Sequence, residues 1–358
     1  MPIDLRTKAL AKLLVDYSLF VKHGESVVIS GSAEAQEFIV ALYKEVILKG
    51  GHPILRVNFP GLNSFFFKHA QKHQIEKFPA HFDFTVRNAQ KYIGIDTESN
   101  TKELASCNPK KITARAKVTH PISDYIVNQK DRIRRCTVGF PCLALAQEAE
   151  MSLVEYEQFV YDACLLDWKK LGKRMDKILN AFKKGKHVHL VGENVDLRFE
   201  IHGDKAFASK GEENMPDGEI FMAPVRESLN GWIKFEYPAI ESGKEVSGIF
   251  LKFKDGKAVE AKADKNEDFL KEMLKVDENS SYVGEFGIGM NPKINRFTKN
   301  LLFDEKIGGT IHLALGMAYK ENGGGNDSSI HWDIVKDMKK ARIVLDGRVV
   351  QDRGRWKI

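Results

Sequence analysis

Two apolar stretches near the C-terminus carry polar groups that could bind a metal ion. His312 lies in the run IHLAL, and the triplet His331-Trp332-Asp333 follows a glycine-rich loop. In a strand, residues i and i+2 point to the same face, so His331 and Asp333 would project together while Trp332 packs behind them. An imidazole beside a carboxylate is a ligand pair that Zn, Mn, Co or Fe accepts. The alternative is that both are ordinary strand residues at the rim of a sheet.

Further carboxylates could complete such a site. Glu219 and Glu285 stand beside glycines in segments that look like strand ends. Three carboxylates nearly neutralise two divalent cations, and a bound hydroxide would balance the charge, as in two-metal aminopeptidases and phosphatases. Spacing alone does not single out these two glutamates among the others. The complete candidate set is Glu219, Glu285, His312, His331 and Asp333.

A mononuclear metal site is the alternative to a two-metal site. His312, His331 and Asp333 alone form a two-histidine, one-carboxylate set, which is typical of mononuclear non-haem iron oxygenases. The role of Tyr319, seven residues after His312, is also open, because it could be a core tyrosine after a strand or part of an active site. The remaining histidines of the N-terminal half are interpreted as structural.

The composition is that of a soluble globular protein with two domains. The chain has 358 residues, of which 43% are hydrophobic and 29% charged. The net charge of +6 is spread along the chain, so no nucleic-acid partner is expected. Apolar residues recur at helical spacing among the lysines of residues 169–186, which predicts an amphipathic helix with these lysines on its solvent-exposed face.

Cysteine usage and hydropathy indicate a cytoplasmic protein. Its four cysteines form no C-x-x-C pair, which favours buried thiols in a reducing compartment. The N-terminus lacks the pattern of a signal peptide, and no uncharged apolar segment is long enough to span a membrane. No membrane partner is therefore expected.

The N-terminal half predicts an α/β domain with a parallel sheet, residues 1–185. A helix over 5–21, a strand over 26–30, a helix over 33–48 and a strand over 53–57 include a βαβ unit. Gly31-Ser32-Ala33 lacks the G-x-G-x-x-G pattern, so no dinucleotide site is inferred. Ser152 and Glu155 predict a capping box at the start of a helix.

The C-terminal half predicts an α+β catalytic domain rich in antiparallel strands, residues 186–358. Apolar and polar residues alternate from Leu197 to His202 and again from Ile249 to Phe253. Asp255-Gly256 and Asp346-Gly347 predict hairpin turns. A helix is expected from about Asn266 to Lys275.

The motifs PDGEIF, GEFGIG, IHLALGMAY and IHWD, in this order, resemble the aminopeptidase T and aminopeptidase S family of metal-dependent peptidases. HGESVVI and VGFPCLALAQEAEMSLVEYEQFVYDA in the N-terminal half are similar to the first domain of that family, so the resemblance covers nearly the whole chain. The segment between Tyr319 and His331 is shorter than in the best-known members.

The resemblance implies a metallo-aminopeptidase, a hydrolase and exopeptidase acting on peptides with a free N-terminus. It implies two divalent metal ions (Zn, Co or Mn), a metal-activated hydroxide and a homodimer. Tyr319 matches the active-site tyrosine of the family and would stabilise the oxyanion. A carboxylate would be the general base, and Glu285 is preferred for this role over the alternative, Glu219. The implied metal ligands are Glu219, Glu285, His312, His331 and Asp333. The alternatives are a ring-cleaving iron dioxygenase, whose fold is similar, and a non-catalytic peptide- or metabolite-binding protein.

Overall fold

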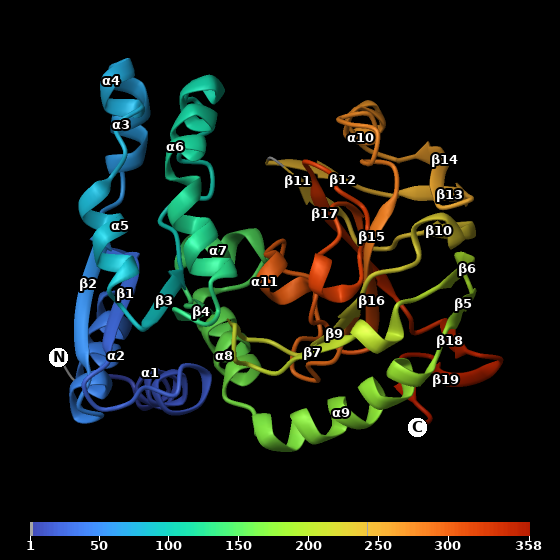
Figure 1. The fold of residues 1–358 in the computed structure, drawn as a ribbon, viewed down its shortest axis with the longest axis horizontal. Helices are drawn as coiled ribbons and strands as arrows, with labels where there is room; N and C mark the ends of the chain where they lie inside the picture. Colours follow the sequence, from blue (N-terminus) through green and yellow to red (C-terminus); the bar gives the residue numbers. More distant parts are fainter. Residues whose placement is uncertain (1–2, 242) are drawn as a thin grey trace. The chain divides into compact units, whose positions relative to one another are not determined.

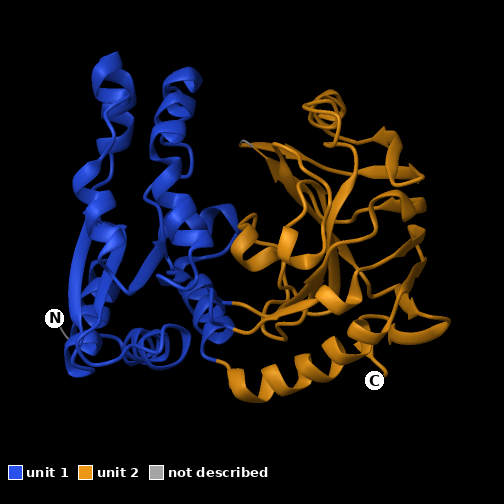
Figure 2. Ribbon diagram, in the orientation of Figure 1, with its two compact units in different colours: residues 1–165, 211–216 blue, residues 166–210, 217–358 orange. Residues whose placement is uncertain are grey.

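The structure is a computed structural model that describes residues 3–241 and 243–358. The chain forms two compact units (Figure 2). Unit 1 comprises Met1–Leu165 and Gly211–Pro216, and unit 2 comprises Leu166–Lys210 and Asp217–Ile358. The predicted fold class is confirmed, because a parallel sheet forms from the N-terminal half and antiparallel sheets form from the C-terminal half.

Unit 1 is built on a five-stranded parallel sheet with the strand order β2-β1-β3-β4-β8 (Figure 1). The strands are β1 (Ser26–Ser32), β2 (His52–Asn58), β3 (Lys91–Asp96), β4 (Arg134–Gly139) and β8 (Asn214–Met215). The helical segments are α1 (Leu5–Leu13), η1 (Leu14–Ser18), η2 (Ala33–Ala35), α2 (Gln36–Leu48), α3 (Leu62–His69), α4 (Lys72–Ile75), α5 (Ala80–Arg87), α6 (Pro109–Asn128), α7 (Leu143–Glu148) and α8 (Leu153–Cys164).

The β1-α2-β2 segment forms where the hydrophobic periodicity predicts it. Five consecutive residues of β1 are buried, as expected for a parallel strand that is covered on both faces. The helix α2 buries Phe38 and Leu42 on one side. Gly50 follows it with a φ of 83°, a left-handed conformation that suits glycine just after a helix.

Two long helices follow in the chain, and their sequence signals are confirmed. Ser152 and Glu155 form the predicted capping box of α8, with reciprocal side-chain to backbone hydrogen bonds. The amphipathic helix α9 (Trp168–Lys184) buries Met175, Ile178 and Phe182 and leaves its lysines on the opposite face. It belongs to unit 2, whereas the predicted domain boundary lies after it, at residue 185. The domains 1–185 and 186–358 stay a prediction.

Unit 2 contains an eight-stranded antiparallel sheet in the order β14-β13-β10-β6-β5-β18-β19-β20 and a five-stranded one in the order β17-β16-β15-β9-β7. The strands are β5 (His187–Gly192), β6 (Val195–Glu200), β7 (Phe207–Ser209), β9 (Glu219–Met222), β10 (Asn230–Lys234), β11 (Ala239–Glu241), β12 (Lys244–Val246), β13 (Phe250–Lys254), β14 (Lys257–Lys262), β15 (Val283–Gly289), β16 (Thr310–Gly316), β17 (His331–Asp337), β18 (Ala341–Leu345), β19 (Arg348–Asp352) and β20 (Arg355–Trp356). The helical segments besides α9 are η3 (Gly203–Lys205), η4 (Arg226–Ser228), α10 (Glu267–Met273), α11 (Leu301–Asp304) and η5 (Lys320–Asn322).

An aromatic core supports the five-stranded sheet from behind. Phe286 of β15 lies 5.1 Å, centroid to centroid, from Phe199 of β6 and 6.4 Å from Phe182 of α9. Trp332 of β17 is also buried. Both Phe286 and Trp332 stand next in sequence to acidic residues, so each strand presents an apolar side chain to the core and a carboxylate to the other face.

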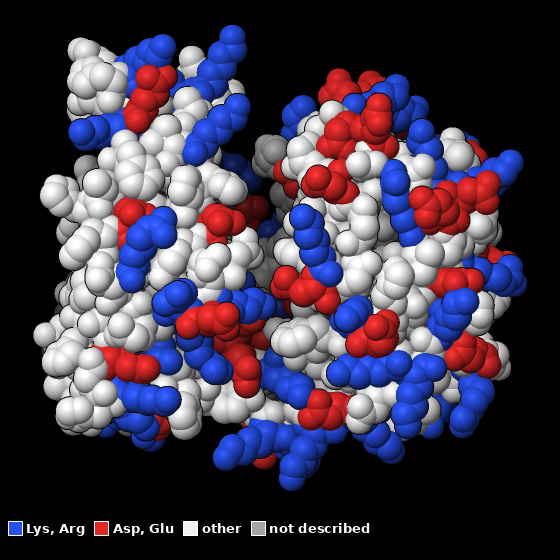
Figure 3. Space-filling view, in the orientation of Figure 1, with Lys and Arg blue, Asp and Glu red and all other residues white. Residues whose placement is uncertain are grey.

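Charged residues of both signs are mixed over the surface shown in Figure 3. The excess of six positive charges is small compared with the 55 basic and 49 acidic residues that produce it. No helix among the described residues combines the length and the apolar composition needed to cross a membrane.

Candidate metal centre

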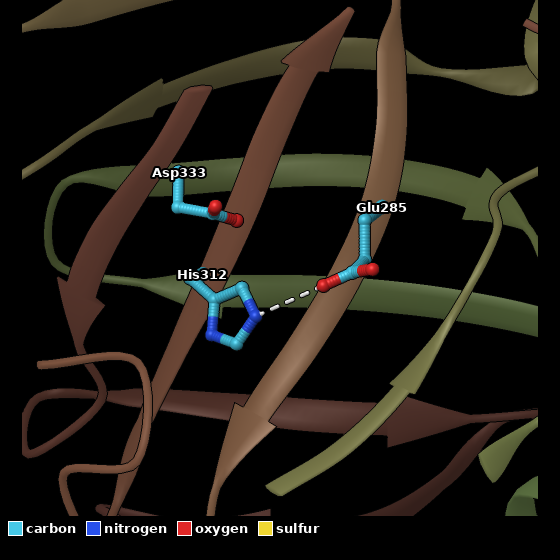
Figure 4. A group of neighbouring side chains, drawn as sticks. All are labelled: Glu285, His312 and Asp333. Carbon is cyan, nitrogen blue, oxygen red and sulfur yellow. Dashed lines mark hydrogen bonds and ion pairs between the residues drawn. The ribbon is translucent and has the colours of Figure 1, made fainter. Parts of the chain in front are cut away.

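Strand register brings two carboxylates and a histidine together on one face of the five-stranded sheet. Ala314 of β16 is paired with Glu285 of β15 on one side and with Asp333 of β17 on the other. Directly paired residues of antiparallel strands point to the same face, and so does His312, two residues before Ala314. Ala314 therefore lies between the two carboxylates in the register of the strands. Figure 4 shows the side chains of Glu285, His312 and Asp333 gathered on this face.

The three polar side chains are close enough to share one cation. One ligand atom from each of Glu285, His312 and Asp333 lies within 4.8 Å of the others, and all three residues are buried. Nε2 of His312 is 3.3 Å from Oε1 of Glu285. Within residues 3–241 and 243–358, the buried Oδ1 of Asp333 and Nδ1 of His312 have no hydrogen-bond partner. A buried carboxylate oxygen without a donor is costly, and a metal ion would satisfy it. The group therefore fits a divalent metal.

Glu219 and His331, the other two predicted ligands, flank this group. Glu219 begins β9, and its Oε2 lies 3.7 Å from Nε2 of His312. On β17, His331 and Asp333 share a face as their spacing predicts, with Nε2 of His331 3.4 Å from Oδ2 of Asp333. The Nδ1–H of His331 donates to the carbonyl oxygen of Met317 at 2.9 Å. This hydrogen bond fixes the tautomer and directs Nε2 toward Asp333.

Tyr319 lies at the edge of the same group. It precedes the short helix η5, and its ring centroid is 5.3 Å from that of His331. Burial raises the pKa of Tyr319, and the negative charge of Glu285 raises it further. The phenol is therefore protonated at neutral pH and can donate a hydrogen bond.

A glycine on the neighbouring strand makes room for the imidazole of His312. Gly287 is the cross-strand partner of His312, and a Cβ atom there would lie only 1.9 Å from Nε2. The ring consequently lies across the backbone of β15 at Gly287. Only glycine at this position allows His312 to reach Glu285.

The structure adds a buried cation that the sequence analysis missed. Lys306, in the loop after α11, is almost completely buried. Its Nζ lies 3.4 Å from Oε1 of Glu219 and 2.5 Å from Oε2 of Glu305. Burial alone would lower the pKa of Lys306, but the two carboxylates outweigh it and raise the pKa, so the lysine stays protonated. Adjacent charges in the segment FDEKIGG resemble an ordinary surface loop, and no spacing signal identifies this lysine.

The closely spaced charges shift the protonation of the predicted ligands. Burial raises the pKa of Glu219 to about 8, against the opposing effect of Lys306. Burial would lower the pKa of His312, but the hydrogen bond to Glu285 and the surrounding carboxylates outweigh it and raise the pKa to about 9. For His331, the charge of Asp333 likewise overcomes burial and raises the pKa to about 10. Without a cation, the group thus retains protons that a metal would displace.

An α/β unit followed by an antiparallel unit with a buried carboxylate–histidine group defines a class of metal-dependent enzymes. Residues 4–356 match the thermophilic metalloprotease family (M29), so the chain belongs to this family. It is 25% identical to the aminopeptidase AmpS of Bacillus subtilis over 398 residues, which covers 94% of each protein. The fold is similar to that of wild-type AmpT from Thermus thermophilus, with a TM-score of 0.86, 24% identity and coverage of 99% of both chains.

These comparisons confirm the predicted family, fold class and enzyme class, a hydrolytic metallo-aminopeptidase. Membership of a metalloprotease family also confirms the expected use of a divalent metal. The fold similarity to a dioxygenase that the sequence analysis named is also found. The 2,5-dihydroxypyridine dioxygenase from Pseudomonas putida matches with a TM-score of 0.59 at 11% identity, over 98% of this chain and 96% of that chain.

Proposed function

We propose that this enzyme removes single residues from the N-terminus of peptides by means of two divalent metal ions. The observation that carries the proposal is the buried group of Glu285, His312 and Asp333, with Glu219 and His331 within 3.7 Å of its members. The names of the relatives, which are aminopeptidases, support peptides with a free N-terminus as the substrates.

In this proposal, five side chains bind the metals. Their types, three carboxylates and two imidazoles, suit Zn, Co or Mn. When bound, the metal ions would supply Lewis-acid chemistry that lowers the pKa of water and polarises the scissile carbonyl. The proposed ligands are Glu219, Glu285, His312, His331 and Asp333.

The protein groups would then move protons and stabilise charge. Glu285 accepts a proton from the attacking water and delivers it to the leaving amine. Glu219 suits this role less well, because Lys306 engages its Oε1. Tyr319 donates a hydrogen bond to the carbonyl oxygen as negative charge develops there, and its raised pKa keeps that proton in place.

The decisive experiment combines metal analysis with a peptidase assay. Protein purified without chelator is analysed for metal content per chain, and release of p-nitroaniline from leucine p-nitroanilide is followed after addition of Zn, Co or Mn. We expect about two metal equivalents per chain and metal-dependent hydrolysis that is lost in His331→Ala. One equivalent of iron without peptidase activity would refute the proposal and favour the ring-cleaving dioxygenase.

We also propose that the enzyme is a homodimer, as the family resemblance implies, and that it acts in the cytoplasm, as its cysteine usage indicates. Light scattering coupled to size-exclusion chromatography measures the mass in solution. A mass of one chain, 40.5 kDa, would contradict the dimer.

A further inference from the structure

A cavity lies at the carboxyl ends of the parallel strands in unit 1. Its volume is about 430 Å³, which is within the range of small-molecule binding sites. Ser32 ends β1, Asn58 ends β2 and Thr97 directly follows β3, and all three residues line the cavity. Polar residues from three neighbouring strands therefore meet in one place.

The strand order explains why a cavity forms at this position. From β1 the chain continues to its neighbour β2, and from β3 it continues to β4 on the opposite side, in the order β2-β1-β3-β4-β8. The two connections diverge between β1 and β3, and such a switch point in a doubly wound sheet leaves a crevice in which ligands bind. The segment after β1 lacks the G-x-G-x-x-G pattern, so the ligand would not be a dinucleotide.

A buried hydroxyl group of the cavity has no partner in the protein. Thr97 is 7% exposed, and within residues 3–241 and 243–358 its Oγ1 has no hydrogen-bond partner. Ser30 of β1, which is 6% exposed, also lines the cavity. Burial of a hydroxyl without a partner is costly, and a polar ligand in the adjoining cavity could supply one.

The cavity also carries negative charge without a basic counterpart. Glu98 and Glu103 line it, whereas no lysine, arginine or histidine is among the described residues that do so. Lys102 forms its ion pair with Glu148, with 3.5 Å between Nζ and Oε1, and not with Glu98. Burial raises the pKa of Glu98, and nearby negative charges raise it further. A positively charged group in the cavity would therefore be attracted to Glu98.

The lining favours an organic cation over a metal ion or an anion. Among the described residues, no three acidic or histidine side chains of this cavity lie close enough to share one metal ion. An anion would meet carboxylates and no basic side chain. The aromatic side chains of Phe59 and Tyr92 also line the cavity, and aromatic faces attract ammonium groups.

We propose that this cavity binds a small molecule that carries an ammonium group together with hydroxyl or amide groups. Glu98 binds the ammonium group, the charge of Glu103 adds to the attraction, and Ser30 and Thr97 form hydrogen bonds with the neutral groups. A carboxylate or phosphate on the ligand weakens binding, because it finds no basic partner. The cavity consists of residues of unit 1, whereas the metal ligands belong to unit 2, so this inference does not depend on the proposed function.

The test compares D-glucosamine with D-glucose, which has a hydroxyl group in place of the ammonium group. Binding of each sugar to the full-length, metal-loaded protein is measured by isothermal titration calorimetry. We expect D-glucosamine to bind at least about 10-fold more tightly than D-glucose, as for one hydrogen bond between charged groups. D-Glucosamine 6-phosphate adds an anion to the same sugar and should bind more weakly than D-glucosamine.

Substitutions in the cavity separate ligand binding from folding. Glu98→Gln should weaken D-glucosamine binding about 10-fold and leave D-glucose binding unchanged. Thr97→Val removes a hydroxyl that has no partner, so it should not lower the midpoint of thermal unfolding but should weaken D-glucosamine binding about 5-fold. It also maintains the test if Glu98→Gln does not fold. As the matched control, Glu76→Gln removes an exposed charge of the same unit outside the cavity and should bind like the wild type.

Several results would overturn the inference. They include no binding of D-glucosamine, equal affinity for D-glucosamine and D-glucose, and wild-type affinity in both Glu98→Gln and Thr97→Val. Tighter binding of D-glucosamine 6-phosphate than of D-glucosamine would also overturn it, and would indicate an anion site at the N-terminus of the helix after β1. Binding that disappears when a chelator removes the metal would place the probe at the metal centre instead. Equal binding by metal-free and metal-loaded protein supports the cavity in unit 1.

Discussion

Replacement of Gly287 by alanine tests how the metal centre is assembled. The new Cβ atom would lie 1.9 Å from Nε2 and 2.1 Å from Cε1 of His312, whereas real Cβ contacts are essentially never shorter than 3.0 Å. The imidazole would have to retreat by about 1.1 Å, the difference between 3.0 Å and 1.9 Å. His312 is fully buried, so the ring can move only at the expense of its contact with Glu285.

The displacement is large compared with the tolerance of a metal bond. Zinc–nitrogen bonds measure about 2.0–2.1 Å, so a shift of this size removes His312 as a ligand. A misplacement of about 1 Å can cost about 100-fold in rate, and we expect at least this loss in kcat/KM for Gly287→Ala. Metal affinity should fall at least about 10-fold, as measured by titration of the metal-free protein.

The glycine-rich loop of the same unit provides a matched control. A Cβ atom at Gly325 would have no neighbour within 4 Å, so Gly325→Ala should retain metal binding and activity. In a His312→Ala background, Gly287→Ala should cause little additional loss of metal affinity, because the clash no longer exists. Wild-type metal affinity and activity in a folded Gly287→Ala protein would refute the proposed packing of the imidazole.

Three further predictions concern catalysis, pH dependence and the loop before β17. Tyr319→Phe should lower kcat by about 100- to 1,000-fold with little change in KM or metal content, and an unchanged kcat would exclude Tyr319 from transition-state stabilisation. The pKa values of His312 and Glu219 are raised to about 9 and about 8, so their contribution to the stability of the metal-free protein is lost as the pH rises through these values. The midpoint of thermal unfolding should therefore fall between about pH 4.5 and 8 through Glu219 and between about pH 6.5 and 9 through His312, more in metal-free than in metal-loaded protein. Parallel curves for the two forms would contradict this. Asp277 accepts hydrogen bonds from the backbone N–H and the hydroxyl of Ser329, so Asp277→Ala should reduce the free energy of unfolding by about 2 kcal/mol, as measured by urea denaturation. A change below about 0.5 kcal/mol would mean that this carboxylate does not hold the loop.

Local patterns in the sequence predicted the elements and part of the candidate site. The buried run of β1, the capping box of Ser152 and the hairpin turns depend on neighbouring residues, so periodicity and turn chemistry are sufficient to predict them. The placement of His331 and Asp333 on one face has the same origin, because the period of two in a strand is local. The motif order predicted the family, which the match over residues 4–356 confirms.

Contacts between distant segments decided the rest. The register of β15, β16 and β17 places Glu285 and Asp333 on either side of Ala314, and no pattern within a single strand specifies that register. The apolar face of α9 was predictable, but the unit that it covers was not, because an amphipathic helix does not specify its partner. Lys306 reaches Glu219 only because the fold brings a loop across Gly289, a close approach between residues far apart in the chain.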